Sequence, residues 1–262
     1  MDLGIENKIV FVSAGSQGLG KAIALGFQAE GARVAICARD AESLRQTQQE
    51  LQAVDGREVL AIEADVSVPA ALANAVQTVQ STWGAIDILI NNAGGPPAGG
   101  HDSISDQQWQ QGFELTVQSA VRLTNLVLPG MKAAGWGRIV NVSSVSVKQP
   151  MANMLLSNSL RLAVLGWAKT LSTELAPHGI LVNTVCPGWT ETNRVTGLLD
   201  AKATAANTSA EQVKQTITNS IPMGRMGQPE EIANAVLFLA SAGASFVTGT
   251  ALAVDGGAAQ TF

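Results

Sequence analysis

Residues 9–30, IVFVSAGSQGLGKAIALGFQAE, combine a strand, a turn and a helix in the pattern that decides the fold. Ile9–Val12 is an apolar run typical of a buried strand, and Lys21–Glu30 has helical character. The turn between them contains Gly15, Gly18 and Gly20. Glycines at such a place let the backbone approach a pyrophosphate, which the free N–H groups and the dipole of the helix attract. The stretch predicts a dinucleotide site, and a tight turn without a ligand is the alternative.

The same alternation of strand and helix continues through the rest of the chain. Helical segments such as Ala41–Val54 separate further strand-like runs, which are Val34–Ala38, Val59–Ile62, Ile86–Ile90, Ile139–Val142, Leu181–Val185 and Ala251–Val254. This pattern is typical of a parallel sheet covered by helices on both faces. Because 262 residues form an ordinary α/β domain and nothing resembles a linker or a repeat, we expect one domain over residues 1–262. Its predicted fold is a Rossmann-type, doubly wound parallel sheet.

Composition narrows the classes of partner. The net charge of −5 and a pI near 5.1 provide no basic field for nucleic acid or for an anionic membrane surface. The sequence contains no run of about 18 apolar residues, so we expect a soluble, cytoplasmic protein. Cys37 and Cys186 lie in apolar runs, which favours buried hydrophobic side chains over a disulfide. With only two histidines, no metal site is expected.

The end of the second predicted strand bears on the choice of dinucleotide. An acidic residue there would pair with the ribose hydroxyls of NAD, whereas Ala38 leaves room and Arg39 can bind a 2′-phosphate. The sequence therefore favours NADP over NAD, although Gln17 in the glycine turn is neutral and Arg39 can equally face solvent. Asp65-Val66, after the third strand, can hold the adenine edge, or Asp65 can cap a helix.

A polar cluster follows the strand Ile139–Val142, at the end where open α/β sheets bind their ligands. It contains Ser143, Ser144, Ser146 and Lys148. Further on, Ser157 and Arg161 are four residues apart at a helix start, so they share one face of that helix. If both side chains point toward Ser144, they form a polar pocket with it. The alternative is that Ser157 caps the helix and Arg161 is solvated. The irregular stretches near 94–102 and 189–220 are candidate substrate loops.

These motifs, together with Asn91–Gly94, Pro187-Gly188 and Asp255–Gly257, resemble the short-chain dehydrogenase/reductase family over nearly the whole chain. The resemblance is greatest to the ketoacyl-carrier-protein-reductase-like members. It implies that the Asn91–Gly94 segment lies beside the adenosine half of the cofactor and that Thr192 contacts the nicotinamide carboxamide. The implied cofactor-binding residues are Ala14, Gly15, Gln17, Gly18, Leu19, Gly20, Arg39, Asp65, Val66, Asn92, Ala93, Gly94, Arg161, Pro187, Gly188 and Thr192.

The departures from the family lie in the chemistry. The family uses Asn, Ser and a Tyr-x-x-x-Lys pair, in which Tyr transfers the proton. Aligned from Ser144 without gaps, the Tyr position holds Ser157 and the Lys position holds Arg161, and the Asn position is Thr116. The chain contains no tyrosine, so no shift of the alignment restores the usual acid. The first glycine of the family's turn is Ala14.

We therefore predict an NADP-dependent oxidoreductase that interconverts a small carbonyl compound and its alcohol. Ser144, Ser157 and Arg161 would stabilise the developing alkoxide, because a serine is too weak an acid to replace a phenol. Lys148 and His101 are other candidate proton donors, although a surface position is favoured for both. The alternatives are a cofactor-binding protein without redox turnover, or a lyase or isomerase in which Arg161 binds an anionic substrate. The resemblance also implies a homotetramer formed through the apolar segments 116–134 and 155–176.

Overall fold

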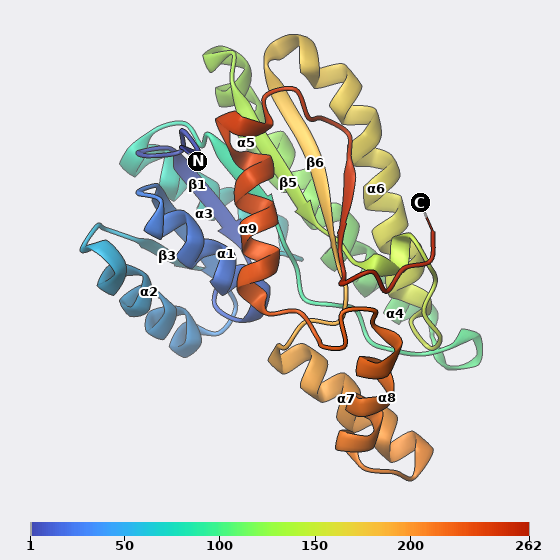
Figure 1. Cartoon of the computed structure of the whole chain (residues 1–262). Helices are drawn as coiled ribbons and strands as arrows, with labels where there is room; N and C mark the ends of the chain where they lie inside the picture. The colour runs from blue at the N-terminus through green and yellow to red at the C-terminus, as the bar shows by residue number, and fades with distance from the viewer. Residues whose placement is uncertain (1, 262) are drawn as a thin grey trace.

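The sheet of the computed structural model, which describes residues 2–261, has seven parallel strands in the order β3-β2-β1-β4-β5-β6-β7 (Figure 1). The strands are β1 (Ile9–Ser13), β2 (Arg33–Ala38), β3 (Leu60–Glu63), β4 (Ile88–Asn91), β5 (Gly137–Val142), β6 (Ile180–Pro187) and β7 (Ala251–Val254). Every pair of neighbouring strands is parallel. The predicted single α/β domain with a Rossmann-type sheet is confirmed.

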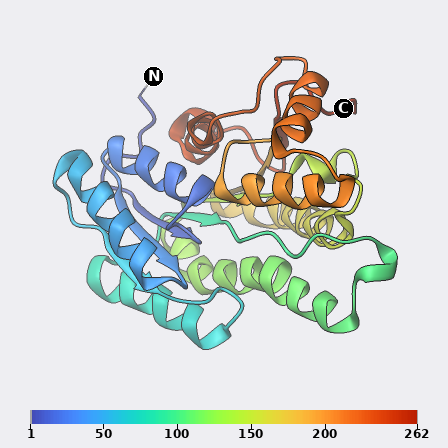
Figure 2. The same cartoon turned by 90° about the horizontal axis from the view of Figure 1, so that it is seen from below.

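Helices lie on both sides of the sheet, as the view from below makes plain (Figure 2). They are α1 (Gly18–Ala29), α2 (Ala41–Asp55), α3 (Pro69–Trp83), α4 (Asp106–Phe113), α5 (Ser119–Ala134), α6 (Leu155–Leu175), α7 (Asn193–Ala206), α8 (Ala210–Ser220) and α9 (Pro229–Ala240). The shorter turns are η1 (His101–Ser103), the π-helical η2 (Glu114–Gln118), η3 (Val145–Val147), η4 (Ala176–His178) and η5 (Ala242–Ala244).

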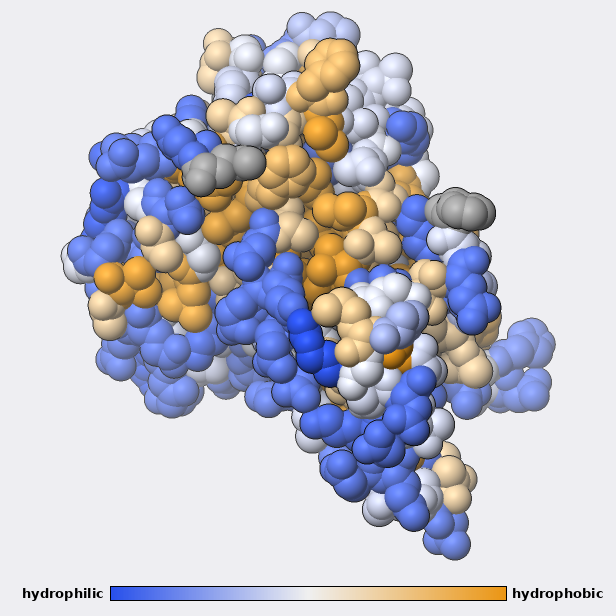
Figure 3. Space-filling model, in the orientation of Figure 1, coloured by the Kyte–Doolittle hydropathy of each residue, from blue (hydrophilic) through white to orange (hydrophobic). Residues whose placement is uncertain are grey.

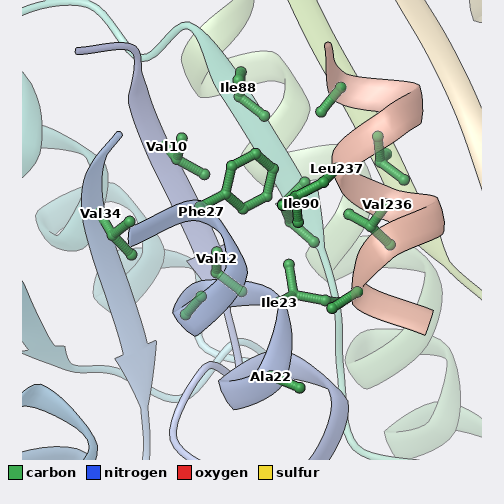
Figure 4. Close-up of a cluster of buried hydrophobic side chains, with 14 of the residues drawn as sticks. Val10, Val12, Ala22, Ile23, Phe27, Val34, Ile88, Ile90, Val236 and Leu237 are labelled. Carbon is green, nitrogen blue, oxygen red and sulfur yellow. The ribbon is translucent and has the colours of Figure 1, made fainter. Parts of the chain in front are cut away.

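The alternation of side chains along each strand builds a separate core on each face of the sheet. In β1, Val10 and Val12 pack toward α1 and α9, whereas Phe11 belongs to the core that α3, α5 and α6 cover. Figure 4 shows the first of these cores, with Phe27 of α1 among side chains of β1, β4 and α9. Phe27 is fully buried, and such burial contributes about 1.5–3 kcal/mol. The two cores hold the strand ends, and therefore the turns that follow them, in fixed positions.

The strand order creates the place where a ligand can bind. The chain runs outward from β1 to β3 and then returns to β4 on the other side of β1. The connections after β1 and β4 therefore leave the sheet in opposite directions, and a crevice opens at their carboxyl ends. Ser13, the last residue of β1, links the two connections, because its hydroxyl donates to the carbonyl oxygen of Asn92, which directly follows β4, at 2.7 Å.

One expectation about local structure was wrong. The stretch 189–220 is not irregular: it contains α7 and α8, which lie beyond the lower end of the sheet in Figure 1. Thr192 begins α7, because its hydroxyl accepts from the N–H of Val195 at 3.3 Å, and Ser209 forms a capping box at the start of α8. A small apolar core that includes Leu199 holds the two helices to the domain.

The surface differs between these parts of the molecule. In Figure 3, α7 and α8 are mostly hydrophilic, whereas apolar side chains gather over α9 and the neighbouring part of the sheet. Phe238 on α9, Leu252 on β7 and Phe246 are exposed. Within residues 2–261, no helix combines the length and apolar character needed to cross a membrane, and no group of three metal-binding side chains is found.

Candidate active site

A cavity of about 470 Å³ lies along the carboxyl ends of the strands. The glycine turn after β1 forms one side of it, and the end of β5, the start of α6 and the segment after β6 form the other. Its size is typical of sites for cofactors and small molecules. Most of the predicted site residues line it, whereas Gly15, Asp65 and Thr116 do not.

The glycine turn is shaped for an approaching oxyanion. A Cβ atom on Gly20 would lie 2.2 Å from the carbonyl oxygen of Ala14 and 2.7 Å from the side-chain nitrogen of Asn92, so only glycine fits there. The side chain of Gln17 makes no capping hydrogen bond at the start of α1. The first N–H groups of α1 and the positive end of its dipole therefore face the cavity. This arrangement fits the diphosphate of a dinucleotide.

Two residues of the turn have other roles. Gly15 donates its N–H to the carbonyl oxygen of Cys37 at 3.0 Å and packs against Ile36, so it joins the turn to β2 instead of lining the cavity. Ala14 has φ = 47°, in the left-handed region that favours glycine. Ala14 thus takes a glycine conformation, at about 1–2 kcal/mol of strain.

The adenosine end of the cavity contains one cation and two hydroxyls. Arg39 is largely exposed, with its Nη1 atom 3.8 Å from Asp65. The hydroxyl of Ser43 donates to that of Ser16 at 3.2 Å, and both serines line the cavity beside Arg39. Asp40 caps α2 by accepting from the N–H of Ser43, and this hydrogen bond lowers the pKa of its carboxyl group. The carboxylate of Asp40 is therefore occupied as the N-cap of α2.

Asp65, which follows β3, has a structural role. Asp65 accepts from the N–H and the hydroxyl of Ser67, at 2.8 and 2.7 Å. Asp65 therefore stabilises the turn before α3 but does not cap that helix, whose N-cap is Val68 without a side-chain hydrogen bond, while Val66 lines the cavity.

At the opposite end, the structure brings Ser144, Ser157 and Arg161 into one cavity wall, in agreement with the sequence expectation. The Oγ atom of Ser144 accepts from the N–H of Ser146 at 3.1 Å, which fixes its rotamer. Nη1 of Arg161 donates to the carbonyl oxygens of Val142 and Ser143, both at 3.1 Å. The end of β5 thus positions both Ser144 and the guanidinium.

Arg161 keeps its charge despite its surroundings. Burial, together with the nearby charge of Arg194, lowers the pKa of its guanidinium to about 10. At neutral pH it is still protonated, so it acts as a fixed cation and not as a proton donor.

Thr116 lies behind this wall. It is buried in the π-helical turn η2, and its hydroxyl has no hydrogen-bond partner among the described residues. It lines a smaller cavity of about 20 Å³, together with Asn91, Ser143 and Arg161. The two other candidate donors, Lys148 and His101, line neither cavity.

Sequence reasoning missed several polar residues of the main cavity, among them Ser16, Ser43 and Arg194. Ser43 was detectable as the partner of an Asp40 helix cap, three residues before it. Arg194 belongs to the first turn of α7, a helix that was expected to be irregular, so no helical face suggested where its side chain would point.

A family model described as enoyl-(acyl carrier protein) reductase matches residues 13–259 of this chain. The chain belongs to the short-chain dehydrogenase/reductase family. It is 34% identical over 255 residues to 3-oxoacyl-[acyl-carrier-protein] reductase of Vibrio cholerae, covering 97% of this chain and 98% of that protein. This short-chain dehydrogenase/reductase is therefore ketoacyl reductase-like within a family of NAD(P)-dependent oxidoreductases.

Solved structures of other members are closely similar. L-sorbose reductase from Gluconobacter frateurii, in complex with NADPH and L-sorbose, has a TM-score of 0.95 and 34% identity, over 100% of both chains. An actinorhodin polyketide ketoreductase variant with NADPH has a TM-score of 0.93 and 36% identity, over 97% of this chain and 98% of that one. Both hold a reduced nicotinamide dinucleotide on the same fold.

Proposed function

We propose that this short-chain dehydrogenase/reductase is an NADP-dependent oxidoreductase that interconverts a small carbonyl compound and its alcohol through an atypical site. The observation that carries the proposal is the single cavity that joins the glycine turn to Ser144, Ser157 and Arg161. Similarity to reductases that bind NADPH supports it.

The cofactor half of the proposal rests on how the residues fit the group. The N–H groups at the start of α1 would hold the diphosphate, and Thr192 and Pro187 would lie along the nicotinamide. Arg39, Ser16 and Ser43 would bind the 2′-phosphate, which is why we favour NADP over NAD. When bound, NADPH supplies the hydride to the substrate carbon.

The polar wall would act on the substrate oxygen. The hydroxyls of Ser144 and Ser157 would donate hydrogen bonds to the carbonyl, and the charge of Arg161 would stabilise the alkoxide that forms. A proton from solvent water entering the open cavity then completes the alcohol, since neither a serine nor a charged guanidinium is a suitable acid. The absence of a positioned general acid would slow the reaction about 10²- to 10⁴-fold relative to a site that has one.

The substrate would enter between two segments. Gly94 and Gly95 line the cavity on the segment after β4, as do Val195 and Leu198 of α7, and the entrance would lie between them. We propose that the segment 94–102 and the α7–α8 region, within 189–220, select the substrate.

The test begins with binding. Wild-type protein and Arg39→Ala are titrated with NADPH and NADH, with cofactor fluorescence as the readout. Arg45→Ala is the matched control, because Arg45 is also on the α2 side but pairs with Glu42 outside the cavity. We expect tighter binding of NADPH than of NADH, a preference that Arg39→Ala removes and Arg45→Ala keeps. Failure to bind either cofactor would refute the proposal.

Turnover is then measured with a panel of small ketones and aldehydes, as oxidation of NADPH. Slow, cofactor-dependent reduction that falls in Ser144→Ala supports the oxidoreductase. Tight binding of NADPH without turnover of any carbonyl compound or alcohol would favour a cofactor-binding protein, because the chain contains no tyrosine to serve as the acid. Turnover of a substrate without any cofactor would indicate a lyase or an isomerase.

A further inference from the structure

We propose that the substrate carries an oxyanion, a carboxylate or a phosphate, and that Arg161 and Arg194 bind it together. The inference rests on the proposed function and specifies its substrate class. Arg194 becomes a specificity-determining residue that sequence reasoning did not find.

The two guanidinium groups line the same cavity and come from different helices. Arg161 comes from α6 and is anchored by the carbonyl oxygens of Val142 and Ser143. Arg194 comes from the first turn of α7 and reaches the segment after β4, where its Nη2 donates to the carbonyl oxygen of Pro96 at 2.8 Å. Each guanidinium has five N–H donors, so anchoring leaves several free to bind an anion.

No acidic side chain balances these charges. None of the salt bridges within residues 2–261 includes Arg161 or Arg194. Asp40 is the one carboxylate among the described residues that line the cavity, and it lies at the adenosine end as a helix cap. The positive charges of Arg161 and Arg194 repel each other, and this repulsion contributes to lowering the pKa of Arg161. A bound oxyanion would relieve this repulsion.

Arg138, which is buried, shows what a structural role looks like for an arginine in this chain, whereas Arg161 is half-buried and Arg194 is exposed. Arg138 also lacks a carboxylate partner, but it lies 4.4 Å from the ring of Trp136 and its nitrogens donate to three carbonyl oxygens, those of Gly137, Gly179 and Ser241. It lines neither cavity. Arg161 and Arg194 instead line the same cavity as Ser144 and Ser157, where the substrate oxygen would lie.

The diphosphate of the cofactor is a competing anion for Arg194. The start of α7 borders the glycine turn, because Thr192 lies 3.5 Å from the position of a Cβ on Gly18. The N–H groups of α1 would hold the diphosphate, which would leave the arginine pair for the substrate. The experiment has to separate these two roles.

The probes are acids and their uncharged counterparts. Pyruvate and methyl pyruvate, levulinate and methyl levulinate, and dihydroxyacetone phosphate and dihydroxyacetone are titrated into the NADPH complex, with cofactor fluorescence as the readout. The proteins are wild type, Arg194→Gln and Arg194→Lys. Lys202→Gln is the matched control, because Lys202 is on α7 but outside the cavity. The readout is binding, so it does not depend on turnover.

We expect at least one anion to bind wild type about ten- to a hundredfold more tightly than its neutral counterpart, as charge-assisted hydrogen bonds do. Arg194→Gln should abolish this preference while NADPH affinity changes less than about twofold, and Arg194→Lys should keep part of it. Lys202→Gln should behave as wild type.

Two results would overturn the inference while leaving the proposed function intact. One is a wild-type NADPH complex that reduces neutral carbonyl compounds but prefers no anion. The other is an Arg194→Gln protein that loses NADPH affinity about tenfold or more with an unchanged acid-to-ester ratio, which would assign Arg194 to the cofactor. Failure of the wild type to bind NADPH at all would instead refute the proposed function.

Discussion

Restoring the family's proton donor should accelerate the reaction. The double substitution Ser157→Tyr with Arg161→Lys introduces a phenol and an ammonium group at positions four apart on α6, where both side chains line the cavity. A positioned general acid contributes about 10²- to 10⁴-fold. The cavity of about 470 Å³ has room for the larger ring. We therefore expect kcat for carbonyl reduction to rise by at least a hundredfold over wild type.

The pH dependence of the rate provides the second part of this prediction. Arg161 stays protonated at neutral pH, because its pKa is about 10, and no histidine or cysteine is among the described residues that line the cavity. The wild-type rate should therefore be flat between about pH 6 and 9. A cation within about 4–6 Å lowers the pKa of a phenol by about 1–3 units from 10, to about 7–9. Reduction requires the protonated phenol, so the rate of the double variant should fall as pH rises through this range.

The assay is steady-state oxidation of NADPH across this pH range, with the carbonyl compound that gives the highest wild-type rate. Ser157→Phe with Arg161→Lys is the control, since it introduces the ring without the hydroxyl and should stay slow and independent of pH. NADPH affinity and thermal melting establish that each variant is folded. If the tyrosine variant binds NADPH yet is no faster than the phenylalanine variant, Ser157 does not occupy the proton-donor position, and the alignment of α6 with the family's Tyr-x-x-x-Lys pair is wrong.

Three further predictions test other parts of the molecule. Ala14→Gly should raise the unfolding free energy by up to about 1 kcal/mol, as the relieved left-handed strain exceeds the added chain entropy; denaturant unfolding measures it, and a loss of stability would contradict the strain. The Arg225 guanidinium lowers the pKa of Glu231 from its ordinary 4.5 to about 2, so that pair's stabilisation is present above pH 4.5 and is lost as pH falls toward 2; melting curves of Arg225→Ala should lack this part of the pH dependence. We also propose a homotetramer through the segments 116–134 and 155–176, and Leu162→Glu on the exposed face of α6 should dissociate it in light-scattering measurements, whereas a monomeric wild type would refute it.

Much of the fold was predictable because it depends on patterns that tertiary contacts reinforce. The buried strand Ile9–Val12 is apolar at every position, as a strand covered on both faces must be, and the structure extends it by one residue. The α7–α8 region was not predictable in the same way. Its helices are largely polar and are capped by Thr192 and Ser209, and capping residues of this kind are common in loops as well.

The site was predictable where residue type and spacing act locally. Ser157 and Arg161 share a helix face by spacing alone, and Ser144 follows a recognisable strand, so their meeting in one wall follows from the topology. Arg194 was not predictable, because its contact with Pro96 joins segments 98 residues apart in the sequence. Nor does any local pattern reveal that Asp65 holds a turn while Val66 lines the cavity.

The contrast between the two ends of the cavity explains how chemistry can diverge on this fold. At the glycine turn, a change at Gly20 would push the backbone of Ala14 aside, so the cofactor end is tied to the packing of β1 and α1. At the other end, Ser157 and Arg161 reach the cavity through their side chains, so a change there alters the chemistry of the wall without displacing the backbone of a neighbouring turn. Because the residues that bind the cofactor are constrained by the fold and the residues that move the proton are not, family membership predicts the dinucleotide more securely than the reaction. The identity of the proton donor therefore has to be measured in this chain, and the proposed anion site at Arg161 and Arg194 is where its substrate would differ from the L-sorbose bound by L-sorbose reductase.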